Sequence, residues 1–272
     1  MNIRKIHSKN AEYQKIEVLK TNRNKRYRYG EFFVEGVRNI NAALANGWRF
    51  SSFLYSCDRP LSRWAQEILC TVQSDVDYEL PSALMEELSG KEDTSELLAI
   101  LKMRDDAMQF KLSGNPMLAL FDRPSNRGNL GTVIRSCDAM GIEGLVITGH
   151  AVDVYDPDTI VSSMGSFFRV PVIRMADNSA ADRFIEEMRS RHPGFQTIGS
   201  SAHAPTSLFD IDMKSPLMFF IGNETDGLSS HFTETCDVVG TIPMDTLSSA
   251  SSLNVACAAT VLFYEAVRQR KS

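Results

Sequence analysis

Residues 241–267 read TIPMDTLSSASSLNVACAATVLFYEAV, and this stretch predicts a buried strand, a loop and a helix in succession. The strand ends at Met244, small polar residues fill 248–252, and the helix starts at about Leu253. Its expected buried face recurs at helical spacing through Ala256, Ala259, Phe263 and Ala266. A helix N-terminus presents unpaired N–H groups, so this serine-rich loop suits an anionic or carboxylate-bearing ligand. A capped core helix without a ligand is the alternative interpretation.

Composition favours a soluble protein without a metal centre. The chain has 272 residues, of which 43% are hydrophobic, and no apolar run approaches the roughly 20 residues of a membrane span. The first thirty residues are polar and charged, which is not typical of a secretory leader. The five cysteines form no pattern with metal-ligand spacing, and we expect reduced thiols in the cytoplasm. No histidine pairs with a carboxylate in a recognisable motif, so none is a catalytic candidate.

Charge is distributed unevenly along the chain. The net charge is −5, yet residues 1–30 hold nine Lys or Arg against two Glu, which makes this arm +7 and the remainder −12. Arg23, Arg26 and Arg28 alternate there with Tyr27 and Tyr29, a combination that suits binding of an RNA backbone with aromatic stacking. A solvated, partly helical surface would carry the same charges, so this interpretation stays open.

The rest of the chain alternates strands and helices in two groups. The first hundred residues predict a small α/β unit, and the polar segment from Arg104 to Gly114 is expected to be a linker. Apolar strands at about 117–121, 145–148, 170–173, 197–200, 217–221 and 238–242 then alternate with helices. Continuous apolar strands of this kind indicate a parallel sheet covered on both faces.

Two further loops in the second group follow apolar strands and precede helices. Residues 124–131, PSNRGNLG, contain Asn129 and lead into a helix that carries Arg135. Residues 221–229, IGNETDGLS, contain Gly222 and Glu224. Ligands of parallel α/β sheets bind beyond the carboxyl ends of the strands, so these side chains should face a site. Alternatively, Arg135 pairs with Asp138 on the helix surface, and each loop is an ordinary turn. The glycines form neither a dinucleotide fingerprint nor a phosphate-binding loop.

Three ordered motifs resemble those of the SpoU/TrmH methyltransferases of the SPOUT superfamily. They are N-x-G-x-x-x-R at 129–135, G-N-E-x-x-G-L-S at 222–229, and I-P-M at 242–244 followed by S-L-N-V at 252–255. The resemblance covers about residues 115–270. Residues 25–44, KRYRYGEFFVEGVRNINAAL, are similar to the small L30e-like substrate-binding domain that often precedes this catalytic domain.

The resemblance implies an α/β protein with a C-terminal SPOUT domain, a trefoil-knotted parallel sheet, preceded by a small L30e-like α/β domain. The corresponding domains would be residues 1–106 for RNA binding and 107–272 for catalysis. It also implies transfer of a methyl group from S-adenosyl-L-methionine to a ribose 2′-hydroxyl in RNA, by a homodimer. Gly222, Ile242 and Leu253 would bind the cofactor, chiefly through backbone groups.

Five residues match the family's catalytic positions: Asn129, Arg135, Glu224, Ser252 and Asn254. Arg135 would either take the hydroxyl proton or hold an RNA phosphate while that phosphate or water takes it, because a guanidinium rarely deprotonates. Either role predicts a large loss of activity when Arg135 is removed. Family members commonly carry Lys or Arg two residues before an S-M-G tripeptide. Here that position is Val161, so this basic RNA contact is either missing or supplied elsewhere.

The leading hypothesis is therefore an RNA ribose 2′-O-methyltransferase, with ribosomal RNA favoured because a separate N-terminal domain is usual in that branch. A tRNA ribose 2′-O-methyltransferase is the alternative within the enzyme class. A non-catalytic RNA-binding or assembly protein is the alternative outside it, and the complete set of catalytic positions argues against that interpretation.

Overall fold

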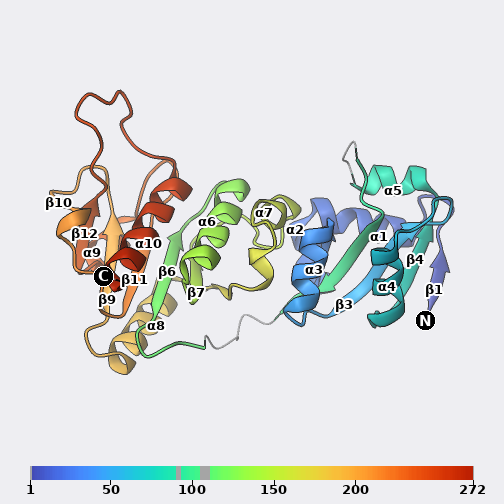
Figure 1. Ribbon diagram of the computed structural model, residues 1–272, viewed down its shortest axis with the longest axis horizontal. Coiled ribbons are helices and arrows are strands. Elements are labelled where there is room, and N and C mark those ends of the chain that lie inside the picture. Colours follow the sequence, from blue (N-terminus) through green and yellow to red (C-terminus); the bar gives the residue numbers. More distant parts are fainter. Residues whose placement is uncertain (1, 90–92, 105–110, 272) are drawn as a thin grey trace. The chain divides into compact units, whose positions relative to one another are not determined.

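The computed structural model describes residues 2–89, 93–104 and 111–271, and its contacts divide the chain into two compact units (Figure 1). Unit 1 comprises Met1–Arg104 with Asp153–Arg169, and unit 2 comprises Asp105–Val152 with Val170–Ser272. The predicted domain boundary at 106/107, and residues 105–110 of the expected linker, lie outside the described residues. The sequence did not predict that Asp153–Arg169 packs with the N-terminal residues.

Unit 1 is built on a five-stranded mixed sheet in the order β1-β4-β3-β5-β2. β5 runs antiparallel to both of its neighbours, and the other pairings are parallel. Its elements are β1 (Ile3–Lys5), α1 (Ala11–Thr21), α2 (Arg23–Tyr29), β2 (Glu31–Glu35), α3 (Val37–Ala45), β3 (Phe50–Ser56), α4 (Arg63–Thr71), β4 (Asp77–Leu80), α5 (Ser82–Ser89), β5 (Leu97–Lys102), α7 (Pro157–Ser162) and the short 3-10 helix η1 (Ser166–Phe168).

The core of unit 1 contains side chains from its first hundred residues and from Asp153–Arg169, which we call the late segment of unit 1. On one face of the sheet, residues of α1 and α5 pack against Phe33, Leu54 and Leu98. Elsewhere, Phe32 lies in an aromatic cluster whose ring centroids are 4.8 to 5.9 Å apart, formed with Trp48, Tyr155 and Phe167. Aromatic pairs at this separation stabilise a core beyond their buried area, so Tyr155 and Phe167 anchor the late segment in unit 1.

Unit 2 is a seven-stranded parallel sheet in the order β10-β12-β9-β11-β6-β7-β8, as the continuous apolar strands predicted. Its elements are β6 (Met117–Asp122), α6 (Arg127–Met140), β7 (Gly144–Thr148), β8 (Val172–Arg174), α8 (Asn178–Arg191), β9 (Gln196–Ser200), β10 (Thr206–Ser207), the 3-10 helix η2 (Leu208–Asp210), β11 (Leu217–Ile221), α9 (Ser230–Thr235), β12 (Val238–Thr241) and α10 (Val255–Lys271).

Helices cover both faces of this sheet. α8 and α9 pack on the face formed by Leu118, Val146 and Phe220. α6 and α10 lie side by side on the other face (Figure 1). There Phe263 of α10 packs against Phe219 of β11, with 5.3 Å between ring centroids. The strand predicted to end at Met244 ends at Thr241 instead, and α10 begins at Val255.

Local sequence sets the ends of the helix that carries the first motif. The Asn126 side chain accepts a hydrogen bond from the Asn129 N–H at 2.9 Å and caps the N-terminus of α6. Gly141, with φ 72°, ends the helix in the left-handed conformation that favours glycine. The first turn of α6 therefore stands directly beyond the carboxyl end of β6.

Candidate active site

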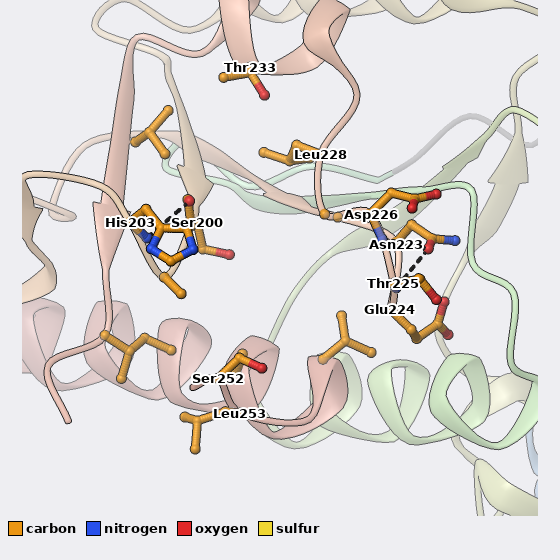
Figure 2. Close-up of a pocket in the computed structure, with 18 of the residues that line it drawn as sticks. Ser200, His203, Asn223, Glu224, Thr225, Asp226, Leu228, Thr233, Ser252 and Leu253 are labelled. Atoms are coloured by element: carbon orange, nitrogen blue, oxygen red, sulfur yellow. Dashed lines mark hydrogen bonds between the residues drawn. The ribbon is translucent and has the colours of Figure 1, made fainter. Parts of the chain in front are cut away.

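Loops at the carboxyl ends of the parallel strands surround a cavity of about 400 Å³. In Figure 2, Asn223, Glu224 and Asp226 stand on one side, Ser200 and His203 stand on the other, and Ser252 and Leu253 lie between them. The cavity is lined by Ser200, Ser201, Ala202, His203, Gly222, Asn223, Glu224, Thr225, Asp226, Gly227, Leu228, Thr233, Val239, Ile242, Met244, Ser252, Leu253, Val255 and Ala258. A volume of this order is typical of small-molecule sites.

All three residues predicted to bind the cofactor, Gly222, Ile242 and Leu253, line this cavity. The surroundings of Gly222 explain why glycine occupies this position. A Cβ added to it would lie 2.3 Å from the Gly227 carbonyl carbon and the Leu228 nitrogen. The loop closes on itself here, because Asn223 and Gly227 exchange two backbone hydrogen bonds at 2.9 and 3.1 Å. Only glycine fits this close approach of backbone to backbone.

A polar network connects three of the five predicted catalytic residues at the edge of the cavity. The Asn129 side-chain amide donates to a Glu224 carboxylate oxygen at 3.3 Å, and the Asn254 side-chain amide donates to Asn129 Oδ1 at 3.1 Å. The Asn254 side-chain oxygen in turn accepts from the Ala256 N–H at 2.9 Å, near the start of α10. Residues separated by more than 90 positions in sequence are thus held together.

Glu224 is held as an anion. Its carboxylate accepts the backbone N–H groups of Ser125 and Asn126 at 2.9 and 3.1 Å and the Ser125 hydroxyl at 2.7 Å. Burial alone would raise the pKa of Glu224, but these hydrogen bonds outweigh burial and lower the pKa below its usual value. The carboxylate is therefore ionised at neutral pH and fixes the loop before α6.

The remaining two predicted catalytic residues occupy different positions. Ser252 lines the cavity. Arg135 is exposed and forms no hydrogen bond or ion pair with another described residue, so the alternative pairing with Asp138 is not formed. Arg135 follows Asn129 by six residues, which places it about 120° around α6 and about 9 Å along the helix axis. Within one chain, Arg135 thus stands apart from the Asn129–Glu224–Asn254 network.

Sequence reasoning missed Asp122 and Arg123, which hold the 222–229 loop in place. The buried Asp122 carboxylate accepts from the Ser229 N–H at 2.9 Å and from the Arg123 Nε at 3.0 Å. The Arg123 guanidinium donates to the Gly227 carbonyl oxygen at 3.1 Å, and the Arg123 backbone oxygen accepts from the Asn223 side-chain amide at 2.6 Å. Arg123 has φ 51°, which is unusual for a residue with a side chain.

His203 was also missed. It lies in the loop between β9 and β10 and lines the cavity opposite Asp226 (Figure 2). No sequence signal marks His203, because no motif surrounds it and only the strand order brings its loop to the site. Among the described residues, no group of three or more His, Cys, Asp or Glu could hold a metal ion.

The predicted RNA-binding arginines of the N-terminal arm have unequal positions in unit 1. Arg28 is exposed, and Arg23 is half-buried with its guanidinium 5.7 Å from the Tyr27 ring centroid. Arg26 is buried. Its side chain donates to Asp153 at 2.7 Å, to Asp156 at 3.2 Å, and to two backbone carbonyls at the end of α1 at 2.9 Å. The prediction that Arg26 lies on an exposed RNA-binding face is therefore wrong.

A family model described as the SpoU rRNA Methylase family matches residues 116–264. The chain belongs to this family. A second model, described as the SpoU L30e-like domain, matches residues 10–99. None of the described helices is long and apolar enough to span a membrane.

Individual relatives of this SpoU methyltransferase agree with the family model. The 23S rRNA (uridine(2479)-2′-O)-methyltransferase of Streptomyces viridochromogenes is 43% identical over 270 residues, which cover 99% of this chain and 93% of the relative. The 23S rRNA (guanosine(2553)-2′-O)-methyltransferase RlmP of Bacillus subtilis is 25% identical over 256 residues, which cover 93% and 96%.

A solved structure also matches over nearly the whole chain. The SpoU methyltransferase AviRb from Streptomyces viridochromogenes in complex with AdoMet has a TM-score of 0.90 and 41% identity, covering 97% of this chain and 99% of that one. The two-part α/β fold, the RNA ribose 2′-O-methyltransferase activity and the S-adenosylmethionine cofactor predicted from the sequence motifs are confirmed.

The contacts of Arg123 lead to a prediction for this SpoU methyltransferase. Arg123→Ala should weaken S-adenosylmethionine binding about tenfold, because Gly227 loses the hydrogen bond from the Arg123 guanidinium, although the Asn223 bond to the backbone oxygen at 123 is kept. Arg123→Gly should weaken binding equally but restore stability relative to Arg123→Ala, since glycine adopts positive φ without strain. Calorimetric titration measures the cofactor affinity of both variants, denaturant unfolding measures their stability, and Arg183→Ala, an exposed change on α8, is the matched control. Full cofactor affinity in Arg123→Gly would show that the Arg123 side chain does not position the loop.

Proposed function

We propose that this chain methylates a ribose 2′-hydroxyl of 23S ribosomal RNA. The observation that carries the proposal is the Asn129–Glu224–Asn254 network at the edge of the cavity lined by Gly222, Ile242 and Leu253. Two relatives named as 23S rRNA 2′-O-methyltransferases, one of them 43% identical, support this choice of RNA. Their names give different nucleotides, a uridine and a guanosine, so what the two relatives support in common is the RNA.

The residues around the cavity fit the cofactor. S-adenosylmethionine supplies an electrophilic methyl group on a sulfonium centre. Glu224 and Asp226 give the cavity two carboxylates, which suit a ligand that carries a sulfonium and an ammonium group. The glycine backbone at 222 permits close approach, and Leu253 and Val255 supply apolar surface to the cavity lining.

The polar network would position the ribose rather than take its proton. Glu224 already accepts hydrogen bonds from Ser125, Asn126 and Asn129, so its lone pairs are largely occupied. The Asn129 amide has a second N–H that is free to donate to the substrate, while its Glu224 and Asn254 contacts fix its orientation. We propose that Arg135 binds an RNA phosphate at the reacting nucleotide and that this phosphate or a water molecule accepts the hydroxyl proton.

The position of Arg135 supports a homodimer. The outer face of α10 exposes Cys257, Val261 and Tyr264 at helical spacing, just after the exposed Leu253. α10 packs beside α6, which exposes Arg135. We propose that a second copy of this chain covers this apolar face and that Arg135 completes the partner's site. A monomeric mass by equilibrium sedimentation at assay concentrations would rule out this arrangement.

We also propose that unit 2 contains a trefoil knot. After β12, which lies beyond β9, the chain returns to pack α10 beside α6, and this crossing supports the trefoil knot that the family resemblance implies. A crystal structure whose chain could be pulled straight from both ends would contradict the knot.

We propose a cytoplasmic location because the proposed substrate is ribosomal RNA, and cell fractionation that recovers the protein elsewhere would contradict it.

The substrate is tested by supplying labelled S-adenosylmethionine with separate pools of transcribed 23S rRNA, 16S rRNA and tRNA. We expect label in 23S rRNA, free or after assembly into large-subunit particles. Label in tRNA alone would favour the tRNA alternative. Cofactor binding and RNA binding without label in any of the three pools would instead favour a non-catalytic RNA-binding protein.

A further inference from the structure

Most cations of the N-terminal arm are paired within unit 1. Ion pairs join Arg4 to Glu12, Lys5 to Glu79, Lys9 to Glu87, Lys15 to Glu31, and Arg26 to Asp153 and Asp156. Lys20 donates to carbonyl oxygens of α5, and Arg23 lies against Tyr27. The arm's net charge of +7 therefore overstates the positive charge that it offers to a ligand.

One cation outside the arm has no such partner. Arg38 lies in the first turn of α3, is exposed, and forms no ion pair or hydrogen bond with another described residue. Among the other lysines and arginines in the described part of unit 1, only Arg28 of α2 is likewise exposed without a side-chain ion pair or hydrogen bond. An unpaired guanidinium on the surface is free to bind phosphate in its planar, bidentate geometry.

Arg38 stands beside an unusual turn. α3 contacts the turn that connects α7 to η1. A Cβ added to Gly165 would lie 3.1 Å from the Ala42 Cβ and 3.6 Å from the Arg38 Cγ. Ser163, buried at the start of the turn, donates to the Ile160 carbonyl oxygen at 2.7 Å. α3 and this hydrogen bond hold the turn in a fixed position.

The turn exposes the apolar Met164 side chain and holds the Met164 backbone in an unfavourable conformation. Met164 has φ 54° and is 40% exposed, although positive φ is unfavourable for a residue with a Cβ. Val161, whose carbonyl oxygen accepts the Met164 N–H at 3.1 Å, is also 40% exposed. Residues 161–166, VSSMGS, carry no charge, and the Arg38 side chain lies against Gly165 of this exposed apolar turn. Strained backbone that the surrounding structure maintains is a feature of functional sites.

We infer that Arg38, Val161 and Met164 form an RNA contact surface of unit 1, in addition to the exposed Arg28 of α2. The Arg38 guanidinium would bind a phosphate of the RNA, and Val161 and Met164 would pack against an unstacked nucleobase next to it. Charge complementarity selects RNA as the occupant, because the surface joins an unpaired cation to apolar groups without an acidic side chain in the turn. The inference rests on the proposed function only in taking RNA as the substrate.

Arg38 is tested by comparing RNA binding of Arg38→Ala with the native chain over a range of salt concentrations. The expected result is an affinity about tenfold lower and a salt slope reduced by about one, as for loss of one phosphate contact. In methyl-transfer assays KM for RNA should rise by a similar factor while kcat stays unchanged. Arg63→Ala is the matched control, because Arg63 is exposed in the same unit but paired with Glu67.

Met164 is tested with Met164→Gly, which removes the apolar side chain and can keep the positive φ of the turn. We expect RNA affinity to fall several-fold while the melting temperature is maintained or raised. Identical affinities and salt slopes for Arg38→Ala and Arg63→Ala would overturn the inference, and so would unchanged binding in Met164→Gly. A native chain that labels no RNA would instead contradict the proposed function, so the two failures are distinguishable.

Discussion

Replacing Arg135 with alanine should reduce methyl transfer by a factor of at least about 10³, while S-adenosylmethionine binds with nearly unchanged affinity. The large effect follows from the proposed role. A guanidinium bound to a phosphate of the reacting nucleotide stabilises the negative charge that develops as the ribose 2′-hydroxyl loses its proton. Arg135 neither lines the cavity nor joins the Asn129–Glu224–Asn254 network, so its removal should leave the cofactor's contacts intact. Single-turnover assays and cofactor titration measure the two quantities separately.

The neighbouring helix position provides a control. Thr132 is exposed on α6 one turn before Arg135, so Thr132→Ala should retain activity. Mixed dimers give a further test of the proposed exchange across the interface. Co-expression of Arg135→Ala with Asn254→Ala chains should recover about a quarter of native activity if Arg135 acts on the partner's site, since half of the dimers then contain one complete site. Loss of cofactor binding together with activity would contradict the role given to Arg135.

Replacing Arg26 with alanine should destabilise unit 1 by about 3–5 kcal/mol. The change leaves the buried carboxylates of Asp153 and Asp156 without their shared cation and removes two hydrogen bonds from the last carbonyls of α1. The effect should appear in denaturant unfolding followed by circular dichroism. RNA binding should fall only as far as the unfolded fraction accounts for it.

Two companion variants make this prediction sharper. Arg28→Ala removes an exposed arginine from the same helix and should leave stability within about 0.5 kcal/mol of the native chain. Combining Arg26→Met with Asp153→Asn and Asp156→Asn should recover part of the lost stability, because no uncompensated charge then stays buried. An Arg26→Ala protein as stable as the native chain would show that the buried ion pairs do not anchor the late segment of unit 1.

The comparison of Arg26 with its neighbours shows where the sequence was insufficient. Arg23, Arg26 and Arg28 have the same charge and nearly the same surroundings in sequence, so a count of charges treats them alike. Arg26 is buried because its partners lie about 127 residues further along the chain, and nothing near Arg26 identifies them. Ion pairing at this distance is a property of the fold.

The parallel sheet and the cavity could be predicted because each depends on local patterns. Continuous apolar strands indicated burial on both faces, and the loops after β6 and β11 placed Asn129 and Glu224 at one edge of the sheet. The short strands β1 and β10 were missed, since three and two residues carry no measurable periodicity. Arg123 and His203 were missed because strand order and an unusual φ, rather than a motif, bring them to the site.

The central claim is that this chain transfers a methyl group to a ribose 2′-hydroxyl, and the chemical position of the transferred label tests it most directly. 23S rRNA labelled by the native protein would be digested to nucleosides and separated. The proposed site predicts that all enzyme-dependent label is recovered in a single 2′-O-methylated nucleoside, and that alkali leaves this nucleotide joined to its 3′ neighbour. Label on a methylated base would contradict the account, because the cavity and its polar network would then serve a different acceptor atom.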